Sequence, residues 1–150
     1  MTNLFIFNTD FRLADNPALF HAAERGESLI TMFIHNPKKW QDHNESDIKI
    51  AFQIEHLKSL KKKLGELNIS LKVIQANGID EENKKIIEFV KTNNINEVFI
   101  NKEYGINEIK RDQNLEKELV NMDKKLNIFD SSVFLPDSIK TQSDTFFKVF

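Results

Sequence analysis

The sequence contains no cysteine, and its 150 residues include only 4 glycines and 3 prolines. Without cysteine the chain has no disulfide framework, no thiolate nucleophile and no cysteine ligands for zinc or an iron–sulfur cluster. The scarcity of glycine and proline, together with 40% hydrophobic residues, excludes collagen-like and low-complexity chains. We therefore expect one ordinary globular domain, and a reducing cytoplasm suits its composition.

A strong charge of one sign is also missing, as are long hydrophobic runs. The formal net charge is −2, from 21 Lys and Arg against 23 Asp and Glu, which gives no electrostatic basis for binding a phosphate backbone. No apolar stretch reaches the roughly 20 residues of a membrane span, and the first residues lack the basic leader of a signal peptide. We expect an unprocessed cytoplasmic protein without membrane contact.

Five short apolar runs predict β-strands, at residues 4–7, 29–34, 71–74, 98–100 and 126–129. Because nearly every position in these runs is apolar, without period-two alternation, they are typical of parallel strands that are covered on both faces. Strands of this kind need helices between them, because a parallel connection must cross the sheet.

Between the runs, apolar residues recur every three or four positions, which predicts four amphipathic helices. Asn16 followed by Pro17 is typical of the start of the first helix. Gly26 and Gly65 are expected to end the first and second helices, and Asn77-Gly78 to form the turn before the third. The alternation predicts an α/β fold: a doubly wound, Rossmann-like, five-stranded parallel sheet in the order 3-2-1-4-5, with helices on both faces.

In a sheet of this order, ligands bind beyond the carboxyl ends of the strands, at the switch point between the first and fourth strands. The two strand exits at this point are the polar segments 8–12 and 101–108. The first exit has no glycine, so neither the dinucleotide fingerprint nor a Walker-type loop is present, and ordinary nucleotide binding is disfavoured. Asp10, Arg12 and Asp15 lie close together there, and one interpretation is an ion pair that shapes the loop.

Asn107 and Glu108 stand where the fourth helix should begin, and they have two compatible interpretations. Asn107 is the N-cap and Glu108 complements the helix dipole, or Glu108 accepts hydrogen bonds from a ligand edge with two N–H donors, as on a pterin. No metal site is proposed, because the four histidines lack metal-ligand spacing. No catalytic residue is proposed either, because there is no cysteine and no glycine-flanked serine elbow.

The last residues of the sequence are apolar, at 146–150. Independent domains seldom end on such a cluster, because chain termini are usually exposed and apolar surface has to be covered. We therefore expect that the native chain continues beyond this point. The alternative is that these phenylalanines fold back onto the domain.

Taken together, these motifs resemble the N-terminal domain of the DNA photolyase and cryptochrome family, and most of all that of bacterial folate-type cyclobutane pyrimidine dimer photolyases. The resemblance is carried by residues 5–19, 40–44, 103–112 and 146–150. The first segment contains the family's Asp-Asn-Pro-Ala-Leu. It departs from the family at Ile6, Asn8 and Thr9, where Trp, Arg and Arg or Gln are usual.

The resemblance implies that the chain is the light-harvesting part of a deoxyribodipyrimidine photolyase. Residues 1–130 would be the α/β antenna-binding domain, and residues 131–150 the start of the linker to a helical FAD-binding domain. In this family an antenna, 5,10-methenyltetrahydrofolate in such bacterial members, passes excitation to reduced FAD, which donates an electron to a pyrimidine dimer in DNA. The flavin and dimer chemistry would lie on the missing domain, so the fragment alone would not be catalytic.

By the same resemblance, Asn107, Glu108 and His43 are the expected antenna-binding residues. The folate would lie between the two domains, so we expect the fragment to retain no cofactor. It would reach DNA only through the helical FAD domain, which is its intramolecular partner, and we expect a monomer. The alternatives left open are a flavin or deazaflavin antenna, 6-4 dimers as substrate, a cryptochrome-type photoreceptor, and a free-standing α/β protein that binds a nucleotide or small ligand.

Overall fold

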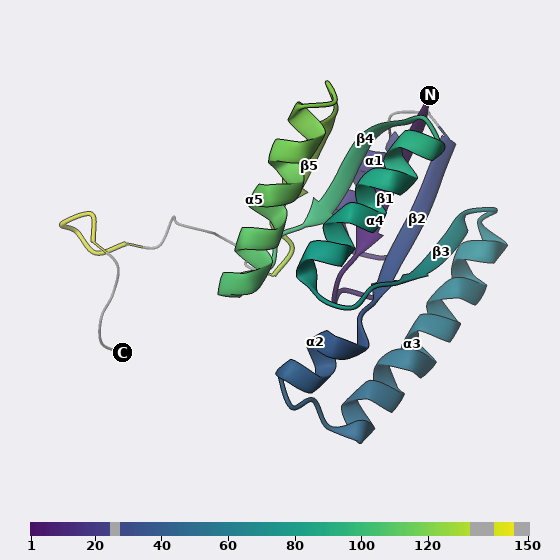
Figure 1. Cartoon of the computed structure of the whole chain (residues 1–150). Coiled ribbons are helices and arrows are strands. Elements are labelled where there is room, and N and C mark those ends of the chain that lie inside the picture. Colours follow the sequence, from purple (N-terminus) through teal and green to yellow (C-terminus); the bar gives the residue numbers. More distant parts are fainter. Residues whose placement is uncertain (25–27, 133–139, 146–150) are drawn as a thin grey trace.

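Five parallel strands form the centre of the structure (Figure 1). They are β1 (Thr2–Phe7), β2 (Ser28–His35), β3 (Ser70–Gln75), β4 (Ile95–Asn101) and β5 (Lys125–Phe129). Their order across the sheet is β3-β2-β1-β4-β5, and every neighbouring pair is parallel. The predicted fold class and strand order are confirmed. The computed structural model describes residues 1–24, 28–132 and 140–145.

Helices connect the strands and cover both faces of the sheet (Figure 1). They are α1 (Pro17–Glu24), α2 (Pro37–Asp42), α3 (Asp47–Glu66), α4 (Ile79–Thr92) and α5 (Ile106–Val120). The sequence predicts all of these except α2. This helix has only 6 residues and buries none of them, so it has no amphipathic pattern by which it is recognised.

Alternate side chains of β1 belong to two separate cores. Leu4 and Ile6 pack with apolar residues of α4 and α5, whereas Phe5 and Phe7 pack with apolar residues of α1 and α3. All four side chains are at most 3% exposed, and burying a residue of this size contributes about 1.5–3 kcal/mol. The two cores hold the sheet between its helices and so fix where the strands end.

Asparagine and aspartate, rather than glycine, take the left-handed positions after three of the helices. Asn68, Asn94 and Asp123 have φ values of 57°, 50° and 57°, in a region that these residue types tolerate better than other non-glycine residues. Gly65 lies inside α3, so the prediction that it ends the helix is wrong. A single glycine costs a helix only about 1 kcal/mol, and the chain turns at Asn68 instead. The predicted turn at Gly78 is confirmed, with φ of 105°.

Helix α2 and the first half of α3 project beyond the carboxyl ends of the strands (Figure 1). With 20 residues, α3 is about 30 Å long, whereas β3 has 6 residues and is about 20 Å long. The buried residues of α3 are Leu60 and Leu64, in its second half. We call residues 37–56 the overhang, because they cover the end of the sheet where a ligand site is expected.

Several sequence predictions fall on residues outside the described part of the chain. These are the end of α1 at Gly26, the apolar segment 146–150, and the middle of the expected linker at residues 133–139. Within the described ranges, no helix is long and apolar enough to cross a membrane.

Candidate functional site

A buried network of amide and carboxylate groups ties the end of β4 to the first loop. Asn101, which is 3% exposed, donates through Nδ2 to the carboxylate of Asp10 and to Oδ1 of Asn16 (2.7 Å). Its Oδ1 atom accepts from the backbone N–H of Ala18 (3.2 Å). Asn16 also accepts from the backbone N–H of Leu19 (3.1 Å), as predicted for the cap of α1. The switch point is therefore a rigid junction of β4, the first loop and α1.

The ion pair suggested for the first loop is replaced by other contacts. Asp10 accepts hydrogen bonds from Asn101 and from the backbone N–H of Asn8 (3.3 Å). Burial raises the pKa of Asp10 more than these hydrogen bonds lower it, so its pKa lies above the usual value. Arg12 directs its own hydrogen bonds to the carbonyl oxygens of Asp15 (2.9 Å) and Ser131 (3.0 Å). The arginine thus fastens the first loop to the segment that follows β5.

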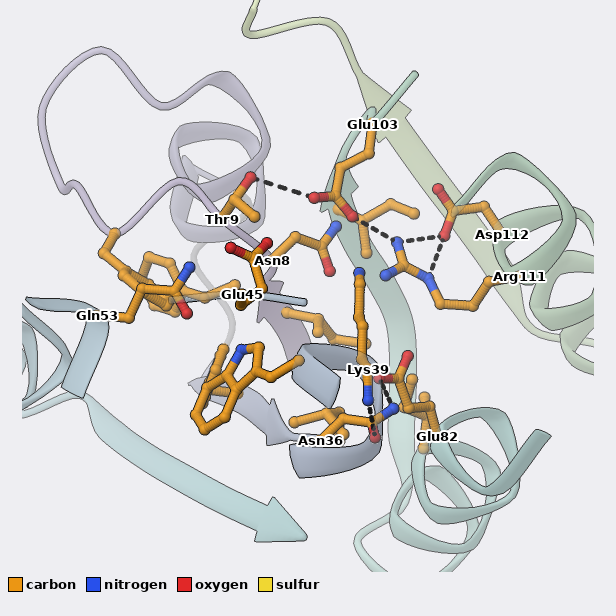
Figure 2. Close-up of a pocket in the computed structure, with 18 of the residues that line it drawn as sticks. Asn8, Thr9, Asn36, Lys39, Glu45, Gln53, Glu82, Glu103, Arg111 and Asp112 are labelled. Atoms are coloured by element: carbon orange, nitrogen blue, oxygen red, sulfur yellow. Dashed lines mark hydrogen bonds and ion pairs between the residues drawn. The ribbon is translucent and has the colours of Figure 1, made fainter. Parts of the chain in front are cut away.

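A cavity of about 490 Å³ opens next to this junction, between the strand ends and the overhang (Figure 2). Its aromatic lining residues are Phe7, Phe11, Phe33, Trp40, Phe52 and His56. A cavity of this size is in the range of small-molecule sites, and aromatic side chains favour flat, aromatic ligands. The cavity is thus suited to a planar heterocycle.

Another wall of the cavity is built from charged side chains (Figure 2). Arg111 is 7% exposed, and its Nη2 atom lies 2.7 Å from Oδ1 of Asp112 and 3.2 Å from Oε2 of Glu103. Thr9 donates to Glu103 from the end of β1 (3.1 Å). Burial lowers the pKa of Arg111, but the charges of Asp112 and Glu103 together raise it by more. The pKa therefore lies above the usual value. The cation therefore holds two acidic side chains in place.

Glu108 pairs with Lys39, which comes from α2. The Nζ atom of Lys39 lies 2.7 Å from Oε1 of Glu108, and the two side chains are 27% and 14% exposed. Burial raises the pKa of Glu108, but the hydrogen bond and the charge of Lys39 outweigh it, and the pKa lies below the usual value. Glu108 is therefore an ionised acceptor at neutral pH.

Asn107 is not the N-cap of α5, so that interpretation is wrong. The helix begins at Ile106, and its N-cap is Gly105, which makes no side-chain cap hydrogen bond. The side chain of Glu108 folds back over Gly105, where an added Cβ atom would collide with it. The helix therefore begins two residues earlier than an N-cap at Asn107 would place it, and Asn107 is exposed.

A second, smaller hollow is lined by both Asn107 and His43. Its volume is about 250 Å³, and it is lined by parts of α2, α4 and α5. Asn107 and His43 are both exposed. Asn36 and Lys39 line this hollow as well as the larger cavity. Two of the three residues expected from the resemblance, His43 and Asn107, therefore line this hollow, whereas Glu108 lines neither space and contacts α2 through Lys39.

Sequence reasoning missed Lys39, Asn36 and Arg111. A signal for α2 was present, because Asn36-Pro37 repeats the Asn-Pro pattern of the first helix, and Asn36 accepts from the backbone N–H of Lys39 (3.1 Å). Nothing in the sequence marks Arg111 as buried. In the described part of the chain, no group of three or more His, Cys, Asp or Glu residues is placed to hold a metal ion.

Comparison with known sequences identifies similar proteins over almost the whole chain. The DNA photolyase family model matches residues 3–150. A deoxyribodipyrimidine photo-lyase of Buchnera aphidicola subsp. Acyrthosiphon pisum is 35% identical over 99% of this chain and 31% of its own length. The Vibrio cholerae protein of the same name is 30% identical over 96% of this chain and 31% of its own length. The chain thus spans about 31% of the length of these relatives.

Solved structures share the same fold. An archaeal photolyase from Sulfolobus tokodaii, solved with two FAD molecules, has a TM-score of 0.82 at 24% identity, over 94% of this chain and 32% of that chain. A cryptochrome from Synechocystis has a TM-score of 0.77 at 20% identity, over 86% of this chain and 27% of that chain. At these identities the likeness concerns the architecture alone.

Proposed function

This chain belongs to the DNA photolyase family, and we propose that it is the N-terminal light-harvesting domain of a deoxyribodipyrimidine photolyase. The observation that carries the proposal is a match over nearly the whole chain to relatives of which it spans only about 31%. Residues 1–130 would be the antenna-binding domain and residues 131–150 the start of a linker. The FAD, the DNA contacts and the repair of pyrimidine dimers would belong to a helical domain beyond them.

We propose that the antenna is 5,10-methenyltetrahydrofolate, bound around Lys39 at the carboxyl ends of the strands. When bound, it would absorb near-ultraviolet or blue light and pass excitation to the flavin. Glu108 supports this assignment, because its ionised carboxylate suits a ring edge with two N–H donors. Asn107 and His43 line the adjoining hollow. Because the folate would lie between this domain and the helical one, we expect the chain by itself to retain none.

The larger cavity favours a second candidate antenna, a flavin or deazaflavin. Its volume of about 490 Å³ and its aromatic walls suit a tricyclic ring. The archaeal relative in fold is described with two FAD molecules and a novel light-harvesting cofactor. The absorption spectrum of the purified full-length protein distinguishes the two candidates, because a folate and a second flavin have different bands.

Exposed apolar side chains on the overhang support contact with the helical FAD domain. Ile48 and Phe52 are 83% and 66% exposed, and apolar surface of this kind is typical of protein–protein contact. The net charge of −2 agrees with a DNA-binding groove that lies elsewhere in the protein. A monomer in the cytoplasm stays a prediction. A cryptochrome-type photoreceptor would share this fold, and repair of dimers separates the two.

Replacing Glu108 with alanine in the full-length protein should deplete the bound folate and spare the flavin chemistry. Loss of a charge-assisted hydrogen bond of about 1.5–3 kcal/mol weakens binding by roughly 10- to 100-fold. Repair driven by light that the flavin absorbs directly should remain unchanged. The measurement is the absorption spectrum of the purified protein, with Glu116→Ala, an exposed change on the same helix, as control. Unchanged folate content in Glu108→Ala would show that Glu108 only serves the start of α5.

A further inference from the structure

We propose that Lys39 is a positioning residue of the antenna site: it holds the carboxylate of Glu108 in the orientation that binds the antenna. The inference rests on the proposed function above and assigns a role to a residue outside the motifs of the family resemblance. On this proposal, the orientation of the Glu108 carboxylate depends on α2 as well as on α5, the helix that carries it.

The position of Lys39 is itself fixed by buried contacts. Asn36, at the start of α2, donates to Oε1 of Glu82 on α4 (2.7 Å). The Oδ1 atom of Asn36 accepts from the backbone N–H groups of Lys39 and Gly78, both at 3.1 Å. Because α2 is fastened to α4 in this way, the side chain of Lys39 starts from a defined point. Figure 2 shows it extended within the cavity.

The contact between Lys39 and Glu108 differs from an ordinary surface ion pair. Exposed pairs contribute about 0–1 kcal/mol because water screens them, but here both side chains are largely covered, and the 2.7 Å contact joins α2 to α5. Lys39 also lines both the larger cavity and the hollow that contains Asn107 and His43. Glu108 is not among the residues that line these two spaces, so Lys39 is the side chain that connects its carboxylate to both of them.

Other charged groups surround the pair, and they do not replace Lys39. Among the described residues, those that line either cavity or act on Glu108 are Lys38 and Asp42 of α2, His43 directly after it, Glu45 before α3, Lys49 and His56 of α3, Asp80 and Glu82 of α4, Glu103 after β4, and Arg111 and Asp112 of α5. Arg111 lowers the pKa of Glu108 less than Lys39 does, and it is already paired with Asp112 and Glu103. Without Lys39, the pKa of Glu108 would be higher than in the parent protein, because the largest influence that opposes burial is removed.

The test uses the full-length protein with added 5,10-methenyltetrahydrofolate and measures retained folate by absorption at several pH values between about 5 and 8. We expect Lys39→Met to weaken binding by roughly tenfold or more. Because the pKa of Glu108 rises in this variant, its folate should be lost at a higher pH than in the parent protein as the pH falls. Lys39→Arg should restore retention, and Lys110→Met, an exposed change on α5, should leave it unaltered.

Glu108→Gln, measured in parallel, separates the two proposals. One outcome is that Glu108→Gln loses its folate while Lys39→Met keeps the parent affinity and pH profile. This outcome would overturn the role of Lys39 and leave the role of Glu108 intact. Failure of Lys39→Arg to restore retention would also overturn the role of Lys39, because arginine keeps the positive charge that the proposal requires. If Glu108→Gln keeps its folate, or if the parent protein binds none, the proposed antenna site is itself wrong.

Discussion

Replacing Arg111 with methionine is expected to lower the free energy of unfolding of this chain by about 3–5 kcal/mol at pH 7. Methionine keeps much of the side-chain volume but removes the cation that contacts Asp112 at 2.7 Å and Glu103 at 3.2 Å. Both of these largely buried carboxylates would then lose the cation that they contact. Urea unfolding measures the effect, with the exposed Lys110→Met as control, which should change stability by less than about 0.5 kcal/mol.

The stability loss in Arg111→Met should depend on pH, with a definite sign. Burial raises the pKa of Asp112 more than Arg111 lowers it, and the pKa already lies above its usual value. Removing the guanidinium raises it further. An acid whose pKa is higher in the folded than in the unfolded state loses stability as the pH rises between those two values. The loss should therefore be small near pH 4 and largest at neutral pH, and an equal loss at both would contradict the account.

Asn101→Asp should be the most disruptive single-atom change at the switch point, costing about 3 kcal/mol or more. The replaced Nδ2 group donates to Asp10 and to Asn16, and each buried hydrogen bond lost in this way costs about 1–3 kcal/mol. The new carboxylate would also face that of Asp10. Asn114→Asp makes the same chemical change at an exposed position of α5 and should have little effect.

The measurement for Asn101→Asp is again urea unfolding, compared at neutral and acid pH. Protonation of the new carboxyl group restores a donor, so part of the lost stability should return as the pH falls. A loss of less than about 1 kcal/mol at pH 7 would show that the junction between β4 and the first loop contributes little, against the burial of Asn101.

The architecture was predictable because its signals are local. Continuous apolar runs such as Leu4 to Phe7 mark strands that are buried on both faces, and Asn16-Pro17 marks the start of α1. Helix α2 was not predicted because its six residues bury no apolar face. The sequence mispredicts the end of α3 because Gly65 is a typical stop residue, whereas Asn68 adopts the left-handed conformation.

The site was only partly predictable, because its remaining residues depend on tertiary contacts. Asn107, Glu108 and His43 came from a family resemblance, and the structure places all three around α2. Arg111 and Asp112 are adjacent charges on a helix, a pattern usually typical of a solvated face. Their burial follows from packing against Glu103 and α4, which the sequence of α5 does not record. The contact between Lys39 and Glu108 could not be predicted from the sequence, because it depends on how α2 packs near α5.

The most direct test of the central claim is the action spectrum of dimer repair by the full-length protein. Purified protein containing reduced FAD is illuminated at different wavelengths on DNA that carries pyrimidine dimers. The account predicts light-dependent repair whose action spectrum follows the bound antenna as well as the flavin, with the antenna component lost in Glu108→Ala. Absence of flavin and of light-dependent repair would contradict the photolyase assignment, and bound flavin without repair would favour a photoreceptor instead.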